Sequence, residues 1–340
     1  MAECCCSPQE KPYTTDAVIS FADRLGALRV RLGIGRNSFR VKPGLYTIGA
    51  PEKTSPVFVT ANYKLSFDSL RAALPGINAW ILVLDTKGIN VWCAAGKGTF
   101  GTKELIKRIT SSRLGSYISH KTIILPQLGA PGVAAHVVKQ QTGFTVVYGP
   151  VRARDIPVFL RNNMHATNDM RRVSFTIADR AVLIPVEMRA AFIPTLIAAA
   201  ACALVFAVSP AGITPSVYVQ SLAYALIVLI GALVSGSMLT PLLLPFIPVR
   251  SFALKGFIVS LPVATLAFLL FQNPFTAAGI ALYALAAGAF FALNFTGSST
   301  YTSLSGVQKE MRVALPFAIT GASLSLLLVI TSRFLGGNAL

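Results

Sequence analysis

Residues 90–102, Asn90-Val91-Trp92-Cys93-Ala94-Ala95-Gly96-Lys97-Gly98-Thr99-Phe100-Gly101-Thr102, surround a single cysteine with small side chains. Apolar runs at residues 80–84 and 89–92 predict strands that lead into this stretch. The spacing of residues 102–113 predicts a helix that leads out of it, with Thr102 as its N-cap. Small residues beside Cys93 let a flat, bulky ligand lie against the backbone. The stretch therefore predicts a ligand site between a strand and a helix.

The same alternation of strands and helices continues on both sides of this stretch. Further strands are predicted at residues 57–60, 122–125 and 144–148, and helices at 66–74, at 131–141 with Pro131 in the first position, and at 155–161. This order indicates an α/β, Rossmann-like domain with a largely parallel sheet. Residues 16–28 predict a short amphipathic helix, and residues 172–185 predict extended strands that close the domain or lead into the membrane.

Loops that follow parallel strands meet at one edge of a sheet and form the ligand crevice there. Four such loops are rich in small or conformationally special residues, at 60–62, 93–99, 127–132 and 149–153. We expect them to surround one ligand.

The second half of the chain is far more apolar than the first. Hydrophobic residues make up 54% of the 340 residues, and uncharged runs predict five membrane spans, at about 188–208, 217–239, 251–271, 275–295 and 313–332. Each run is long enough to cross a hydrocarbon core of roughly 30 Å. The predicted organisation is an N-terminal extension (1–40), the α/β domain (41–187) and an all-α transmembrane domain of about five helices (188–340).

The charge distribution predicts the orientation in the membrane. Only six of the 30 Lys and Arg residues follow Glu187, so most of the net charge of +17 belongs to the α/β part. Basic loops around Arg250 and Lys255 and around Lys309 and Arg312 indicate cytoplasmic sides. The first twenty residues lack the apolar core of a signal peptide. We therefore expect a multi-pass protein of the cytoplasmic (inner) membrane, with its α/β domain in the cytoplasm. The basic charge is not interleaved with aromatic residues, which argues against nucleic-acid binding.

The residues alone leave two interpretations of Cys93 open. A buried cysteine that only packs in the core and a thiolate ligand of a soft metal are about equally supported. Cys202 falls in the first predicted span and is expected to pack there. Cys4, Cys5 and Cys6 either form an unstructured tail, the favoured interpretation, or relay a thiophilic metal ion. His120, His136 and His165 have no metal-site spacing and are expected to be structural.

The chain resembles the corrinoid protein of the microbial mercury-methylation pair. The resemblance rests on residues 90–97, on the segment 59–65, on the loops 125–132 and 148–153, and on the tail of about five spans. The corrinoid domain of that family is similar to the corrinoid iron–sulfur protein of acetyl-CoA synthesis, which lacks both the tail and the cysteine ligand. Many cobalamin proteins supply a histidine from an Asp-x-His-x-x-Gly motif, and this sequence does not contain it.

The resemblance implies a cobalamin-dependent methyltransferase in which Cys93 is the catalytic residue and the lower ligand of the cobalt. It implies that a methylated pterin or a methyl donor protein supplies a methyl group, which the corrinoid passes to Hg(II) to form methylmercury. It also implies a ferredoxin-like partner with two [4Fe–4S] clusters that returns the cobalt to its reduced state. Cofactor contacts are predicted for Thr60, Asn62, Asn90, Val91, Trp92, Cys93, Ala94, Ala95, Gly96, Lys97, Gly98, Thr99, Gln127, Leu128, Gly129, Gly132, Gly149, Val151 and Ala153.

Two other functions remain open at this point. One is a corrinoid methyl carrier of one-carbon metabolism with a different acceptor, and the other is a membrane transporter with a sensing domain. Residues 190–249, 256–308 and 313–332 contain no Asp, Glu, Lys, Arg or His. Ion-coupled transporters usually need such residues within the membrane, so an anchoring role is favoured over transport.

Overall fold

The computed structural model describes residues 11–208, 212–213, 215–298 and 304–335, so the predicted thiol cluster at residues 4–6 lies outside the described part. The chain divides into two compact units. The first unit consists of the residues up to Val30 together with Ile34–Ser174, and the second consists of Arg31–Gly33 together with Phe175–Leu340.

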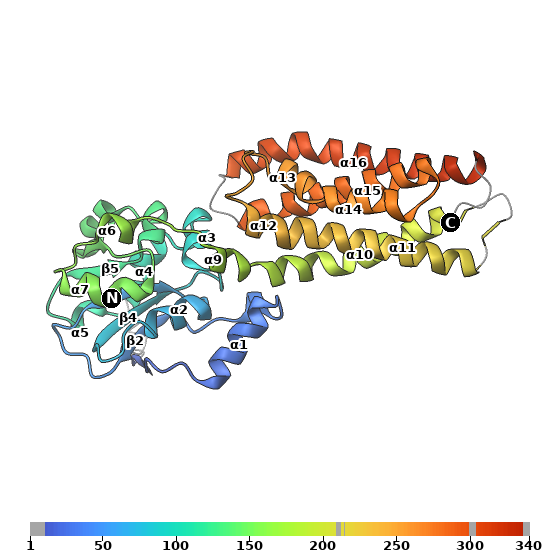
Figure 1. The fold of residues 1–340 in the computed structure, drawn as a ribbon. Helices are drawn as coiled ribbons and strands as arrows, with labels where there is room; N and C mark the ends of the chain where they lie inside the picture. The colour runs from blue at the N-terminus through green and yellow to red at the C-terminus, as the bar shows by residue number, and fades with distance from the viewer. Residues whose placement is uncertain (1–10, 209–211, 214, 299–303, 336–340) are drawn as a thin grey trace, which may run out of the picture. The chain divides into compact units, whose positions relative to one another are not determined.

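The first unit is built on a mixed six-stranded sheet in the order β1-β2-β4-β3-β5-β6 (Figure 1). The strands are β1 (Tyr13–Thr15), β2 (Gly44–Ile48), β3 (Val57–Ala61), β4 (Ala79–Leu84), β5 (Thr122–Leu125) and β6 (Thr145–Tyr148). Neighbouring strands are parallel except β2 and β4, which run antiparallel with Gly44 opposite Val83. Every residue of β3 and β4 is buried, as in a sheet that helices cover on both faces.

Alternating side chains of the central strands point into two separate cores. Val57, Val59 and Ala61 of β3 belong to one core, whereas Phe58 belongs to the other. Helices α3 (Val91–Gly96), α4 (Thr102–Ser111), α5 (Leu114–Tyr117) and α6 (Ala135–Thr142) contribute to the first core, and α2 (Lys64–Arg71), α7 (Ile156–Arg161) and α8 (Asn168–Arg171) contribute to the second. The result is a three-layer α/β unit. Helix α1 (Phe21–Arg31) precedes β2.

The predicted strands at 57–60, 80–84, 122–125 and 144–148 are confirmed, as are the helices near 102–113 and 155–161. The helix predicted at 66–74 is α2, which begins two residues earlier, and the helix predicted at 16–28 begins only at Phe21. Strands β1 and β2 were not predicted, because they are short and each depends on its partner strand.

The predicted strand at 89–92 is wrong. Lys87 and Gly88 both have positive φ and turn the chain after β4, and α3 starts at Val91. Asn90 is the N-cap of α3, since its side chain accepts a hydrogen bond from the Cys93 N–H at 2.9 Å. The apolar residues at 89–92 therefore begin a helix rather than a strand.

Three other local predictions are also wrong. Gly101, not Thr102, is the N-cap of α4, and the Thr102 hydroxyl instead accepts a hydrogen bond from the Ala134 N–H. Pro131 does not open a helix but lies inside a 3-10 turn, η2 (Gln127–Gly132). Residues 172–185 are not strands, because Thr176 and Asp179 form a capping box that starts α9 (Ile177–Ala181).

The second unit is helical. After α9 it contains α10 (Ile184–Phe206), α11 (Pro215–Val234), the π-helical segment η4 (Ser235–Leu239), α12 (Thr240–Leu243), α13 (Phe252–Val259), α14 (Leu261–Leu270), α15 (Pro274–Asn294), the 3-10 turn η5 (Phe295–Ser298) and α16 (Leu304–Leu335). Five candidate membrane spans result, Ile177–Val205, Pro215–Leu243, Phe252–Leu270, Pro274–Asn294 and Ser305–Ser332. Their number agrees with the sequence prediction.

Small residues let the helices of this unit approach closely. A Cβ added at Gly236 would lie 2.5 Å from the Gly288 carbonyl oxygen, and one added at Gly256 would meet the same oxygen at 2.5 Å. Cys202 is buried and its thiol lies 3.1 Å from the Tyr283 hydroxyl, as expected for a packing role.

The sequence predicted basic loops around Arg250 and Lys255 and around Lys309 and Arg312, but Lys309 and Arg312 lie within α16. Glu310 accepts hydrogen bonds from the Ser251 hydroxyl and the Ala253 N–H, both at 2.8 Å. Lys255, however, is not in a loop: it lies in α13, is buried, and donates to the Leu244 and Ile247 carbonyl oxygens. Lys255 therefore provides hydrogen bonds to carbonyl groups of the segment after α12 and does not mark an exposed loop.

Candidate functional site

A cavity of about 350 Å³ opens at the carboxyl ends of the central strands of the first unit. Its walls come from β3, α2, the start of α3, the end of β5 and the segment after β6, and consist of Phe58, Val59, Thr60, Leu65, Ser66, Ser69, Leu70, Asn90, Val91, Trp92, Ile124, Leu125, Pro126, Leu128, Gly149, Pro150, Val151, Ala153 and Ile156. The lining is mainly apolar, with a few hydroxyl groups.

The topology of the sheet explains why the cavity lies there. Strands β3 and β5 are neighbours, but the chain leaves β3 toward α2 on one face and leaves β5 toward α6 on the other. The two connections diverge and leave a gap above the strand ends, which is the usual ligand site of open α/β sheets.

A hydrogen-bonded hub fixes the loop that leads from β4 into α3. The Asn62 side-chain oxygen accepts from the Thr86 N–H at 3.1 Å, the Thr86 hydroxyl at 2.8 Å and the Gly88 N–H at 2.9 Å. Its amide nitrogen donates to Asp85 at 3.1 Å. Asn62 is buried and holds this loop, so its contribution to the site is positional.

Helix α3 presents Cys93 directly after three cavity-lining residues. Asn90, Val91 and Trp92 line the cavity, and Trp92 is 43% exposed. The Cys93 thiol is free and exposed, which excludes the interpretation of Cys93 as a buried core residue. A soft, accessible thiol therefore directly follows the residues of α3 that line the cavity.

The small residues after Cys93 have a packing role that the sequence did not reveal. Ala94 and Ala95 are buried against η2, and a Cβ added at Gly132 would lie 3.1 Å from the Ala95 Cα and would collide with the Phe100 carbonyl oxygen. A Cβ at Gly129 would meet the Phe100 ring at 2.5 Å. Backbone thus packs directly on backbone, and this contact holds α3 rigidly beside the strand ends.

The predicted cofactor residues fall into three groups. Eight of them line the cavity: Thr60, Asn90, Val91, Trp92, Leu128, Gly149, Val151 and Ala153. Cys93, Gly96, Lys97 and Gly98 are exposed on or just after α3, and Thr99 is partly exposed. Asn62, Ala94, Ala95, Gln127, Gly129 and Gly132 lie behind the lining and support it.

Several lining residues were missed. Leu65, Ser66, Ser69 and Leu70 project from α2 at helical spacing, and Phe58, Val59, Ile124 and Leu125 lie within the strands. Ser66 and Ser69 are three residues apart between apolar residues of the same helix, and this spacing could have indicated a helix face that lines a ligand site.

Two polar groups near the lining are notable. The Gln127 side-chain oxygen is buried and accepts no hydrogen bond from the described residues, although its neighbours Pro126 and Leu128 line the cavity. Burial raises the pKa of Tyr148, whose hydroxyl donates to the Val133 carbonyl at 2.7 Å. The buried side-chain oxygen of Gln127 is therefore available to a hydrogen-bond donor on a ligand.

Two features of the described residues bear on metal binding by side chains, the clustering of such side chains and the roles of the histidines. Within the described ranges no group of three or more His, Cys, Asp and Glu side chains converges. His120 uses both ring nitrogens, one within 2.9 Å of the Ser55 carbonyl and the other accepting from the Thr122 N–H at 3.2 Å. Its role is structural, as predicted.

Comparison with known proteins gives consistent similarities to corrinoid proteins. Residues 29–160 match the family described as CO dehydrogenase/acetyl-CoA synthase delta subunit. The chain is 34% identical over 125 residues to the acetyl-CoA decarbonylase/synthase complex subunit gamma of Methanocaldococcus jannaschii, covering 36% of this chain and 25% of that protein. It is 32% identical over 127 residues to the corrinoid/iron-sulfur protein large subunit of Moorella thermoacetica, covering 37% and 28%.

The chain thus spans about a quarter of the length of these curated relatives. The family match begins within α1, includes β2 to β6 and every cavity-lining residue, and ends in α7. Residues 29–160 are therefore similar to part of acetyl-CoA synthase complex subunits and of a corrinoid/iron-sulfur protein.

Proposed function

We propose that this chain is a membrane-anchored, cobalamin-dependent methyltransferase that uses Cys93 as the lower cobalt ligand and Hg(II) as its methyl acceptor. The observation that carries the proposal is the free, exposed Cys93 thiol directly after three cavity-lining residues. The similarity of residues 29–160 to corrinoid proteins supports the cofactor, and the five candidate spans support the anchor.

The residues at the cavity fit a corrinoid. Cobalamin is too bulky for a cavity of about 350 Å³, but a detached nucleotide base of the cofactor is a suitable occupant. Ser66, Ser69 and Thr60 would supply hydroxyl groups to it, while the apolar wall would cover the base. The Gln127 oxygen would accept a hydrogen bond from an amide of the cofactor.

The proposed role of Cys93 is to donate electron density to the metal. Cobalamin, when bound, supplies the transferable methyl group. A thiolate is a softer and stronger donor than an imidazole, and this favours transfer of the methyl group as a carbanion equivalent to an electrophile such as Hg(II). Asn90 and Asn62 hold the helix and loop that position the thiol, as partners around metal ligands commonly do.

Sustained turnover requires a separate reductant. The proposed transfer to Hg(II) would need two electrons from a reductant before each further turnover. The part of the chain that the structure describes has no clustered ligands for an iron–sulfur centre. We therefore include in the proposal a ferredoxin-like partner with two [4Fe–4S] clusters and a methylated pterin or methyl donor protein, acting on a cytoplasmic α/β unit.

The spectrum of the purified chain reconstituted with cobalamin tests the ligand. Cys93→Ala should remove the spectral signature of thiolate-bound cobalt, and Cys93→Thr should behave in the same way, because a hydroxyl replaces a soft sulfur poorly. Cys202→Ala is the matched control, since this cysteine is buried beside Tyr283 in the membrane unit. A wild-type spectrum in Cys93→Ala would exclude Cys93 as the ligand.

An anaerobic acceptor assay separates the two corrinoid functions. Methylmercury should form with the chain and its reducing partner, and it should be lost with Cys93→Ala. The names of the relatives favour one alternative, a corrinoid carrier that serves one-carbon metabolism with another acceptor. Methylation of another acceptor but not of Hg(II) would favour this alternative. The absence of any bound corrinoid would favour a transporter with a sensing domain.

A further inference from the structure

Helix α1 of the first unit carries an apolar stripe that faces away from the sheet. Val18 just before the helix and Phe21, Leu25 and Leu28 within it are 71%, 81%, 55% and 55% exposed. The spacing of Phe21, Leu25 and Leu28 by four and three residues places these three along one side of the helix. Three large apolar side chains in one exposed row, with exposed Val18 just before them, are unusual for a surface that meets only water.

The opposite side of α1 contacts its own unit. Val30 is buried, and a Cβ added at Gly26 would lie 2.9 Å from the Phe39 ring. Ser20 and Asp23 cap the helix reciprocally, since the Ser20 hydroxyl accepts from the Asp23 N–H and Asp23 accepts from the Ser20 N–H, both at 3.1 Å. The exposed stripe therefore cannot rotate inward without breaking these contacts.

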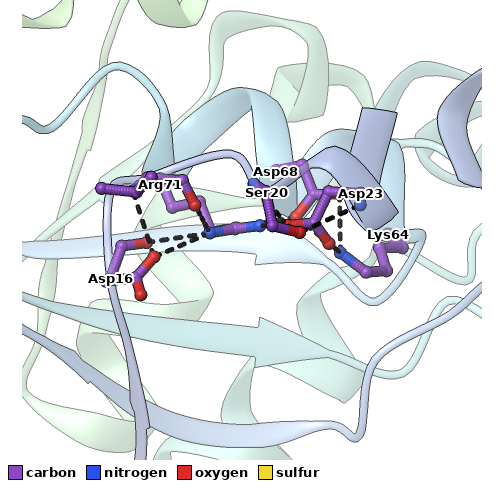
Figure 2. A network of polar contacts seen from close by, with 7 residues as sticks. Asp16, Ser20, Asp23, Lys64, Asp68 and Arg71 are labelled. Carbon is purple, nitrogen blue, oxygen red and sulfur yellow. Dashed lines mark hydrogen bonds and ion pairs between the residues drawn. The ribbon is translucent and has the colours of Figure 1, made fainter. Parts of the chain in front are cut away.

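A network of charges holds α1 to α2 (Figure 2). Arg71 donates to Asp23 at 2.6 Å and to Asp68 at 2.7 Å, and Lys64 contacts Asp23 at 2.6 Å and Asp68 at 2.8 Å. Arg71 also contacts Asp16 at 3.1 Å. Arg71 and Asp68 are buried, so the network is shielded from solvent and tightly placed.

Arginines flank the stripe. Arg24, Arg29 and Arg31 of α1 are all exposed, and helical geometry places them on either side of the row of apolar residues. A helix with exposed apolar residues between cations is suited to lie in the plane of an anionic lipid surface, with its apolar face in the acyl boundary. Chain connectivity makes a membrane available to this helix. The described residues contain five candidate spans, and residues 31–33, at and just after the end of α1, belong to the unit that contains those spans.

We infer that α1 is a membrane-surface helix that inserts Phe21, Leu25 and Leu28 into a bilayer containing anionic phospholipids. The charge network transmits this attachment to α2. Leu65, Ser66, Ser69 and Leu70 of α2 line the cavity, whereas Lys64, Asp68 and Arg71 of the same helix bind the network. The helix that forms a wall of the cavity is thereby fixed to the lipid surface. This inference does not depend on the identity of the cofactor or acceptor.

Photocrosslinking of the full-length chain in proteoliposomes tests the occupant of the stripe. The photoreactive analogue p-benzoylphenylalanine replaces Phe21, and in a control chain it replaces Val158, an apolar residue of α7 that is 39% exposed. In vesicles of phosphatidylglycerol and phosphatidylcholine, lipid adducts should form at position 21 and be severalfold rarer at position 158. Peptide adducts from residues 175–335, or crosslinked dimers, would show that protein covers the stripe and would overturn the inference. So would an absence of adducts at position 21.

Charge reversal tests the choice of an anionic surface. The double variant Arg24→Glu and Arg29→Glu should reduce the lipid adducts at position 21 severalfold. The control variant Arg154→Glu and Arg161→Glu changes the charge equally, outside α1, and should not reduce them. Equal adduct yields in pure phosphatidylcholine and in phosphatidylglycerol vesicles would overturn the assignment to anionic lipid. Circular dichroism of each variant verifies that its fold is retained.

Discussion

At the scale of single residues, Asn62 links the end of β3 to the loop that carries α3. Its oxygen accepts three hydrogen bonds and its nitrogen donates one to Asp85. Only an amide side chain combines an oxygen that accepts with a nitrogen that donates to a carboxylate, and Asn62 has the shorter of the two amide side chains. The position therefore requires an amide, although the residue lies outside the cavity lining.

We predict that Asn62→Asp weakens both the fold and cofactor binding. The carboxylate keeps the three acceptor contacts but faces the Asp85 carboxylate, which lies 3.1 Å from the present amide nitrogen. The lost hydrogen bond and the repulsion should cost about 1–3 kcal/mol of unfolding free energy. The loss should diminish on acidification, because one of two adjacent carboxyl groups then binds a proton. Denaturant unfolding and cobalamin titration at pH 5 and pH 8 measure both effects.

Asn78→Asp is the matched control for this change. The Asn78 side chain uses its oxygen to accept from the Ala50 N–H at 3.1 Å, and a carboxylate preserves that contact. A loss of stability in Asn78→Asp equal to that in Asn62→Asp would contradict the importance of the donated hydrogen bond.

Substitutions at Gly132 and Gly96 distinguish a role in packing from a role in contact with the cofactor. We predict that Gly132→Ala destabilises the unit by about 1–3 kcal/mol, because the added methyl collides with the Phe100 carbonyl and overpacks the contact with Ala95. Gly96→Ala meets nothing within 4 Å and should leave the cofactor-free fold as stable as wild type or more so. Thermal unfolding without cofactor, followed by cobalamin titration, measures the two effects. Reduced cofactor affinity in a fully stable Gly96→Ala would place the cofactor against α3.

At the scale of elements, the strands of the sheet were more predictable than the turns between them. Residues 80–84 form a continuous apolar run, and such a run in an α/β pattern has few alternatives to a buried strand. Strand β2 was missed because Gly44–Ile48 mixes residue types and is stabilised by its antiparallel pairing with β4. Such stabilisation comes from a partner distant in sequence, which local patterns do not contain.

The helical part of the candidate site was misread for a different reason. The three apolar residues Ile89, Val91 and Trp92 suit a strand as well as the start of a helix. The deciding feature was Asn90, whose side chain caps α3, together with the positive φ of Lys87 and Gly88. The role of Ala94 and Ala95 also required the structure, because their packing partner, η2, lies more than thirty residues away.

We predict that the contact between α1 and α2 depends on pH only under acidic conditions. Burial alone would raise the pKa of Asp23, but hydrogen bonds from Lys64, Ser20 and Arg71 outweigh it and lower the pKa well below the usual value of 3.8. The stabilisation from Asp23 is therefore complete above about pH 4 and is lost as the pH falls below that value. Hydrogen exchange of α1 between pH 7 and pH 5 should show unchanged protection relative to α2.

Asp23→Asn mimics the protonated state at neutral pH. It should accelerate amide exchange in α1 severalfold at pH 7, whereas Asp16→Asn should have a small effect, because the Asp16 side chain is 75% exposed. Equal protection in wild type and Asp23→Asn would show that apolar contacts alone hold α1.

At the scale of the whole molecule, the second unit predicts a simple membrane topology. Glu310 in the first part of α16 accepts a hydrogen bond from Ser251, so we expect Arg250 and Lys309 to lie at the same side of the membrane. Gln272, between α14 and α15, should lie on the other side. With five spans, we expect the α/β unit in the cytoplasm and the end of α16 outside.

Accessibility of introduced cysteines measures this topology in intact cells. A membrane-impermeant thiol reagent should label Gln272→Cys but not Lys309→Cys, in chains whose natural cysteines are replaced. Labelling of both positions from outside, or of Lys309→Cys alone, would contradict the five-span arrangement.

The cavity has its walls spread along the chain from Phe58 to Ile156, and this spread affects how the protein is made. Because β3, β5 and β6 pair through long crossovers, the ligand crevice cannot close until the ribosome has delivered α7. The first candidate span begins at Ile177, only a short distance later. Folding of the nascent α/β unit and capture of the first span by the insertion machinery therefore overlap in time. The rate at which residues 157–176 are translated therefore decides the order of two events, completion of the cavity walls and insertion of the first span into the membrane.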